Sequence, residues 1–258
     1  PSWLLEMVAK NKRAYHTILA SKMQNLLDDN LMPTVCQNAK CPNRGDCFCS
    51  GDATIMILGS ICTRFCRFCA VEKCVKEKPL PPDNTEPTRS ANLVKKLNLK
   101  YLVLTMPTRD DLIDGGAEHI SKVCKEIIKV NPQVKIESLI SDLNGKFEYL
   151  PLILESGISV LGHNMETTPS LYRAVNYERS LELLKKSKEI APNILTKSSL
   201  MLGLGETEEE LKQVFNDLRK VNCNLLTLGQ YLAPSLKHYQ VIDYPKPEYY
   251  EKLKAYAL

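Results

Sequence analysis

The sequence predicts an α/β fold built on a parallel sheet, and three observations support this. Six short segments are apolar and β-branched enough to form buried strands, at 53–59, 101–105, 135–140, 158–161, 196–202 and 225–231. Helical patterns separate them, at about 88–98, 116–130, 146–156, 177–190 and 207–221. Polar residues follow several of the strands directly. Helical crossovers make successive strands parallel, either as an open doubly wound sheet or as a curved partial barrel.

Local chemistry also predicts where some elements begin. Thr207 can cap the helix at 207–221, and Glu210 can reach back to the Thr207 amide. Near the other end of the chain, residues 11–29 have apolar positions at helical spacing and a charged opposite face, which predicts one amphipathic helix. Pro42 and Gly45 interrupt the segment that follows, so we expect a loop there.

The composition excludes several classes of function. The chain has 258 residues, 44% of them hydrophobic and 25% charged, so it is long enough to bury a core without disulfides. A net charge of +4 is too small to favour a nucleic-acid partner. No apolar run approaches the roughly 18 residues of a membrane span, and no signal peptide is present. We therefore expect a soluble protein with no membrane partner.

The cysteines are concentrated in residues 36–74, which contain eight of the ten in the chain. Such crowding in a mid-sized chain favours metal ligation in a reducing compartment over a secreted disulfide scaffold. Two triplets stand on either side of the first predicted strand: C-x4-C-x5-C at Cys36, Cys41 and Cys47, and C-x3-C-x2-C at Cys62, Cys66 and Cys69. Thiolates are soft ligands for iron–sulfur clusters, zinc or copper.

The second triplet is the more specific signal. Three thiolates within eight residues can hold three corners of a cubane cluster and leave the fourth iron open to a small molecule. The alternative is a structural zinc site that borrows a distant histidine such as His163, although structural zinc sites usually pair cysteines as C-x2-C. Polar residues at 109–116, 163–166 and 203–206 follow other strands, where ligands gather in parallel sheets.

With Phe68 before its last cysteine, the second triplet resembles the signature of radical S-adenosylmethionine enzymes. Within that superfamily the chain is similar to the lipoyl synthase family over essentially its whole length, and the first triplet distinguishes this family from most relatives. The matching sequence segments include Ala53–Gly59, Arg109–Leu112, Asp114–Ala117, His163–Thr167, Tyr177–Ser180, Gly203–Thr207 and Gly229–Leu232. The resemblance implies a partial (β/α)6 TIM-type barrel at 53–258, one compact unit, after an N-terminal extension at 1–52 that contains the auxiliary-cluster loop.

The resemblance further implies two 4Fe–4S clusters and S-adenosylmethionine as cofactors. Cys62, Cys66 and Cys69 would hold the cluster that cleaves S-adenosylmethionine to a 5′-deoxyadenosyl radical. Cys36, Cys41 and Cys47 would hold a second cluster that supplies sulfur to C6 and C8 of an octanoyl chain on a carrier lysine. The implied partners are an octanoylated lipoyl-carrier domain, from a dehydrogenase E2 subunit or the glycine cleavage H protein, and an electron donor such as ferredoxin or flavodoxin. The implied compartment is the cytoplasm, or a mitochondrion or plastid in a eukaryote.

The same resemblance suggests contacts to S-adenosylmethionine at Gly115, Gly116, Asn164, Glu166 and Arg179. The alternative for the glycine pair is an ordinary loop turn, and the alternative for His163 is a hydrogen-bonded histidine at a strand end. The sequence departs from the family pattern in three places: it begins at Pro1 inside a family motif, the link at 173–176 is short, and it stops at Leu258 without the family's C-terminal serine segment. The fourth ligand of the second cluster is therefore left open.

Two rival functions stay open at this point. Another sulfur-inserting radical enzyme, of the biotin synthase type, would share the second triplet, but the first triplet argues against it. A non-catalytic iron–sulfur or metal-binding protein would use the strands and helices only as a scaffold.

Overall fold

The centre of the molecule is a curved parallel sheet. The computed structural model describes residues 1–39, 41–50, 54–171 and 176–258. Its six strands are β1 (Thr54–Met56), β4 (Tyr101–Thr105), β5 (Lys135–Leu139), β6 (Val160–Gly162), β7 (Leu195–Leu202) and β8 (Leu225–Gln230). They lie in sequence order and every neighbouring pair is parallel, with β1 and β8 at the two edges. The sheet is thus an open, partial barrel, which confirms the predicted fold.

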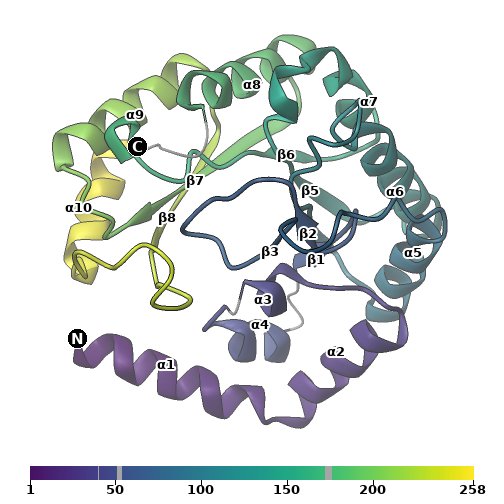
Figure 1. Ribbon diagram of the computed structural model, residues 1–258, viewed down its shortest axis with the longest axis horizontal. Coiled ribbons are helices and arrows are strands. Elements are labelled where there is room, and N and C mark those ends of the chain that lie inside the picture. Colours follow the sequence, from purple (N-terminus) through teal and green to yellow (C-terminus); the bar gives the residue numbers. More distant parts are fainter. Residues whose placement is uncertain (40, 51–53, 172–175) are drawn as a thin grey trace.

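Helices cover the outside of this sheet (Figure 1). They are α5 (Glu86–Leu97), α6 (Ala117–Val130), α7 (Leu150–Leu154), α8 (Tyr177–Ile190), α9 (Glu208–Lys220) and α10 (Pro247–Ala257). Each turns an apolar side inward, as α6 does with Ile120, Val123 and Ile127, which are almost fully buried. Burial of one such side chain stabilises the fold by about 1.5–3 kcal/mol. The predicted capping box at the start of α9 is present between Thr207 and Glu210.

Several predicted elements were wrong in detail, each for a local reason. The helix expected at 11–29 is two helices, α1 (Ser2–Tyr15) and α2 (Ile18–Asp29), because the Thr17 hydroxyl accepts a hydrogen bond from the Ala20 amide and starts a new helix. The helix expected at 146–156 is shorter in the structure, where only α7 is an α-helix. The 3-10 turns η1 (Leu143–Gly145) and η2 (Phe147–Tyr149) come before it, and Pro151 lies in its first turn. The helix α10 was not predicted.

The segment before β1 is also more ordered than predicted. Instead of a plain loop it contains α3 (Val35–Asn38), which begins with a capping box of Thr34 and Gln37, and α4 (Arg44–Ser50). Thr34 bridges to Ile55, and the Met56 amide donates to the Pro33 carbonyl at 2.8 Å. The first cysteine triplet is therefore attached to the edge of the sheet at β1.

Two predicted features fall partly on residues that are not described. Residues 173–175 of the short link, and Ala53 at the start of the first predicted strand, lie outside the described ranges. Asn176, at the end of that link, caps α8 by accepting a hydrogen bond from the Arg179 amide at 2.9 Å. Among the described residues, no helix combines the length and apolar character that a membrane crossing requires.

Candidate active site

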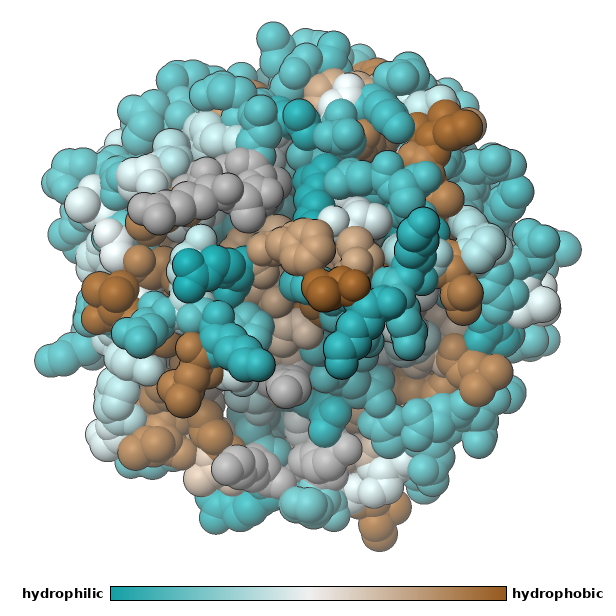
Figure 2. Space-filling view, viewed as in Figure 1, coloured by the Kyte–Doolittle hydropathy of each residue, from teal (hydrophilic) through white to brown (hydrophobic). Residues whose placement is uncertain are grey.

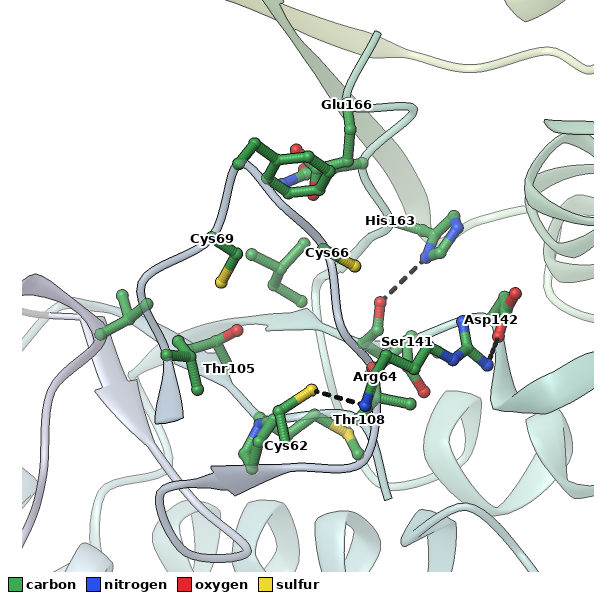
Figure 3. Close-up of a pocket in the computed structure, with 18 of the residues that line it drawn as sticks. Cys62, Arg64, Cys66, Cys69, Thr105, Thr108, Ser141, Asp142, His163 and Glu166 are labelled. Atoms are coloured by element: carbon green, nitrogen blue, oxygen red, sulfur yellow. Dashed lines mark hydrogen bonds and ion pairs between the residues drawn. The ribbon is translucent and has the colours of Figure 1, made fainter. Parts of the chain in front are cut away.

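The second cysteine triplet opens onto a cavity at the carboxyl ends of the strands. Cys62 ends the short strand β2 (Ile61–Cys62), and Cys66 and Cys69 follow in the same loop. All three line a cavity of about 210 Å³, together with residues that follow β4, β5 and β6. In Figure 3 the three sulfur atoms surround this common space. The triplet therefore lies where a partial barrel binds its ligands.

Hydrogen bonds and ion pairs attach this loop to the neighbouring strands. The Thr63 amide and hydroxyl both donate to the Thr108 carbonyl, at 3.0 and 2.9 Å. The Arg64 guanidinium donates to Asp110 at 2.8 and 2.9 Å and also to the fully buried Asp142. The Arg64 amide donates to the Cys62 sulfur at 3.4 Å. The three cysteines are therefore held in place by the ends of β4 and β5.

The environment of these thiols suits ligands of an electropositive group. Burial raises the pKa of Cys66 to about 11 and also raises that of Cys69. The cysteines raise one another's pKa, which means that their sulfurs are close together, and Lys73 opposes the shift. Three thiolates so close together, one of them buried and two half-buried, need compensating positive charge, which a bound iron–sulfur cluster supplies. The donor set and its burial thus fit the cluster that the resemblance implies.

His163 is not available as a metal ligand. Its buried ring contacts the Ile140 carbonyl through Nδ1 and the Ser180 hydroxyl through Nε2, both at 2.9 Å. Since a carbonyl can only accept, Nδ1 carries the proton and Nε2 accepts from Ser180. Burial also lowers the pKa of His163. The zinc site that would borrow this histidine is therefore wrong, and His163 is the hydrogen-bonded residue of the alternative interpretation.

A second cavity is lined by one cysteine of the first triplet and one of the second. Cys36 is on α3 and Cys47 on α4, while Cys41 is in the turn between them, where its amide donates to the Cys36 carbonyl at 3.0 Å. Burial raises the pKa of Cys41, and the charge of Cys36 raises it further. Cys41 lines a cavity of about 680 Å³ that Cys69 also lines. One space is therefore bounded by a cysteine from each triplet.

The cavities separate the five predicted S-adenosylmethionine contacts into two groups. Asn164 and Glu166 line the cavity of the second triplet, and Glu166 lines both cavities. Glu166 adopts a φ of 66°, and burial raises its pKa to about 7 against the opposing effect of a hydrogen bond from Asn164.

The other three predicted contacts line neither cavity. Gly116 has a φ of +95° at the start of α6, and a Cβ there would lie 2.5 Å from Leu58 Cδ1. Gly115 packs against Leu143 in a similar way. Arg179 donates to Asn144 at 2.8 Å and contacts Asp142 at 3.4 Å, so it reaches the cavity only through Asp142. Residues 203–206 also line neither cavity. The Glu206 carboxylate accepts hydrogen bonds from the Gly203 and Leu204 amides of its own loop.

The structure adds lining residues that sequence reasoning missed. They are Met106–Thr108 after β4, Ser141 and Asp142 after β5, and Lys73. The first two groups follow predicted strands, and their position alone could have identified them. Lys73 had no such signal, because it reaches the cavity through the short strand β3 (Glu72–Lys73), which pairs with β2.

Comparisons with known proteins agree with this geometry. The radical SAM superfamily profile matches residues 56–218. The chain is 47% identical over 262 residues to the lipoyl synthase of Caldicellulosiruptor saccharolyticus, covering 100% of this chain and 89% of that protein. It is 48% identical over 236 residues to the lipoyl synthase of Caldanaerobacter subterraneus, covering 90% of this chain and 82% of the relative.

A solved structure shows the same fold at low sequence identity. HydG, a maturase of the FeFe-hydrogenase, superposes with a TM-score of 0.62 at 13% identity, covering 98% of this chain and 60% of that one. The profile match and the sequence identity to the two lipoyl synthases mean that the chain belongs to the radical SAM superfamily and, within it, to the lipoyl synthase family.

Proposed function

We propose that this chain is a sulfurtransferase that inserts two sulfur atoms, at C6 and C8 of a protein-bound octanoyl-lysine chain, to give the lipoyl cofactor. The observation that carries this proposal is the cavity of about 680 Å³ bounded by Cys41 of the first triplet and Cys69 of the second. Sulfur insertion requires one substrate carbon to lie between the source of the radical and the source of the sulfur. A single space that both triplets reach meets this requirement, since orientation is a large part of catalysis.

The two triplets would hold the two 4Fe–4S clusters. Cys62, Cys66 and Cys69 would hold one, and Cys36, Cys41 and Cys47 the other. When bound, these clusters and S-adenosylmethionine supply the electron, the radical and the sulfur. A passive metal-binding protein has no use for a substrate cavity between two cysteine triplets. A biotin synthase-type enzyme also needs a source of sulfur, but the position of the first triplet before the first barrel strand argues against it.

The remaining task of the chain is to bind a hydrocarbon and exclude water. The cavity is within the roughly 300–1,000 Å³ typical of small-molecule sites. Its walls include the apolar side chains Trp3, Met7, Phe68 and Met201, which favour an alkyl chain over water. Figure 2 shows apolar side chains gathered near the centre of this face of the molecule and surrounded by hydrophilic ones. An octanoyl chain could enter there while its carrier stays outside.

Among the predicted S-adenosylmethionine contacts, we favour Asn164 and Glu166 as direct ones. Both line the cavity of the three thiols, and an amide and a carboxyl are the groups that hydrogen-bond a ribose or an amino group. We assign indirect roles to Gly115, Gly116 and Arg179. The glycines let Leu58 and Leu143 pack closely, and Arg179 holds Asp142 in the cavity wall.

We extend the proposal to the organisation and partners of the chain. Residues 1–52 form an extension that carries the first triplet, and 53–258 form one compact barrel unit; packing of α4 against α1 and α2 supports this division. The expected partners are an octanoylated carrier domain, from a dehydrogenase E2 subunit or the glycine cleavage H protein, and a ferredoxin or flavodoxin donor. The ten cysteines, eight of them crowded into residues 36–74, suit metal ligation in a reducing compartment, which we take to be the cytoplasm, or a mitochondrion or plastid in a eukaryote.

Anaerobic reconstitution tests the proposal. The full chain should take up about eight irons and eight sulfides, because two cubane clusters hold four of each. With dithionite and S-adenosylmethionine it should release 5′-deoxyadenosine and convert an octanoyl-lysine peptide to the lipoyl form. Stable binding of zinc without cleavage would support a passive metal-binding protein instead. Cleavage and sulfur insertion on dethiobiotin would support the biotin synthase alternative.

A further inference from the structure

Lys73 enters the cavity of the second triplet through a strand pairing. The strands β2 and β3 are parallel, and Cys62 is the register partner of Lys73. Partners in register place their side chains on the same face of a ribbon. The Cys74 amide also donates to the Cys62 carbonyl at 3.0 Å, which holds this register. Both Cys62 and Lys73 accordingly line the same cavity.

Lys73 differs from the other cations near this cavity, because those cations have an ion-pair or ring partner. Its Nζ is buried and, among the described residues, has no hydrogen-bond partner. Arg64, which lines the same cavity, is paired with Asp110 and Asp142. Arg67, in the same loop, lies outside the lining, with its guanidinium 4.9 Å from the Tyr239 ring centroid. A buried ammonium without a partner is costly, so this one is placed for an anion that binds in the cavity.

The three cysteines that line this cavity with Lys73 create an anion when they hold a cluster as thiolates. Lys73 is the register partner of Cys62, and Cys66 and Cys69 line the same cavity, so the Lys73 ammonium faces the group that the three sulfurs would hold. We propose that Lys73 is a positioning residue that compensates the negative charge of the thiolate-bound cluster at Cys62, Cys66 and Cys69. This rests on the proposed function.

The expected consequence is a less negative reduction potential. Reduction by the external donor adds one electron, and therefore one negative charge, to the group held by the thiolates. A fixed cation nearby stabilises the reduced form more than the oxidised form. Removing that cation should therefore disfavour reduction. The carboxylate of S-adenosylmethionine is a further anion that could reach Lys73, so the potential is measured without it.

The test uses full-length chain with Cys36, Cys41 and Cys47 changed to Ala, so that only one cluster contributes. Lys73→Met removes the charge at similar length, Lys73→Arg keeps it, and Lys76→Met removes an equal charge from an exposed lysine nearby. In redox titrations followed by electron paramagnetic resonance, Lys73→Met should shift the reduction equilibrium about tenfold, or 59 mV for one electron, to more negative potential. Lys73→Arg and Lys76→Met should stay within about threefold of the parent.

The outcomes separate this inference from the proposed function. A parent protein that takes up no four-iron cluster contradicts the proposed function itself. A loaded Lys73→Met protein with the parent's potential overturns the role of Lys73, even when its affinity for S-adenosylmethionine falls. If Lys73→Met does not load, Lys73→Gln replaces it. If Lys73→Arg takes up the cluster and both neutral variants do not, a positive charge at this position is required. If Lys73→Arg also fails to take up the cluster, the proposed role of the charge is overturned.

Discussion

Replacing Arg64 with methionine tests how the cysteine loop is held at the cavity. The guanidinium pairs with Asp110 and with Asp142, whose side chain has an exposed fraction of 0%. Removing one partner of a buried ion pair typically costs about 3–5 kcal/mol, because a charge is left without compensation. Arg179 stays near Asp142 at 3.4 Å and Asp110 is partly exposed, so we expect the lower end, about 3 kcal/mol. For a chain of this size that corresponds to a fall in Tm of about 6–12 °C.

The loss should also depend on pH. Burial opposes ionisation of Asp142, but the hydrogen bond and charge of Arg64 outweigh it and hold the pKa of Asp142 below its ordinary value of 3.8. A carboxylate with a lowered pKa stabilises the fold above its unfolded pKa, and this contribution disappears as the pH falls through the folded pKa. The difference in Tm between the parent and Arg64→Met should therefore be full at pH 7 and should shrink below about pH 4.

Thermal unfolding of the anaerobically reconstituted proteins, followed by circular dichroism at several pH values, measures both effects. Arg67→Met is the matched control, because it removes the same charge from an exposed residue of the same loop. Its stacking on Tyr239 is worth about 0.5–1 kcal/mol. Equal losses of Tm in the two variants, or a difference that does not change with pH, would refute the reasoning.

Three further predictions follow from the site and its packing. Cys62→Ala should abolish cleavage of S-adenosylmethionine, because only three thiolates hold the cluster at Cys62, Cys66 and Cys69, while the cluster at Cys36, Cys41 and Cys47 still assembles. Release of 5′-deoxyadenosine and the iron content measure this, and retained cleavage would contradict the assignment. Cys41→Ala should spare cleavage but stop sulfur insertion, and normal lipoyl product by mass spectrometry would show another sulfur source. Gly116→Ala should lower stability by about 1–3 kcal/mol, because its φ is +95° and its Cβ would meet Leu58; Gly59→Ala, also at positive φ but with nothing within 4 Å, should lose less in the same unfolding assay.

The glycine pair and Arg179 show how the position of a predicted site residue depends on packing. Gly115 and Gly116 follow the second barrel strand, where the resemblance suggests a cofactor contact, and in the structure both pack closely at the start of α6; their contact with the cofactor stays a prediction. Arg179 begins α8 and contacts Asp142 rather than the cavity. Position after a strand identifies a neighbourhood, but which side chains face the cavity depends on packing between elements.

The sequence by itself determined the six strands, most of the helices and the spacing of the two cysteine triplets of this protein. Strand and helix periodicity, the capping box at Thr207 and the spacing within each cysteine triplet depend on residues a few positions apart, so they can be read directly along the chain. Only the tertiary structure decided which distant residues meet. It paired Arg64 with Asp142, 78 positions away, placed Lys73 beside Cys62, and brought Cys41 and Cys69 to one cavity. These contacts arise from sheet register and from packing of the loops at the carboxyl ends of the strands, and neither leaves a periodic trace in the sequence.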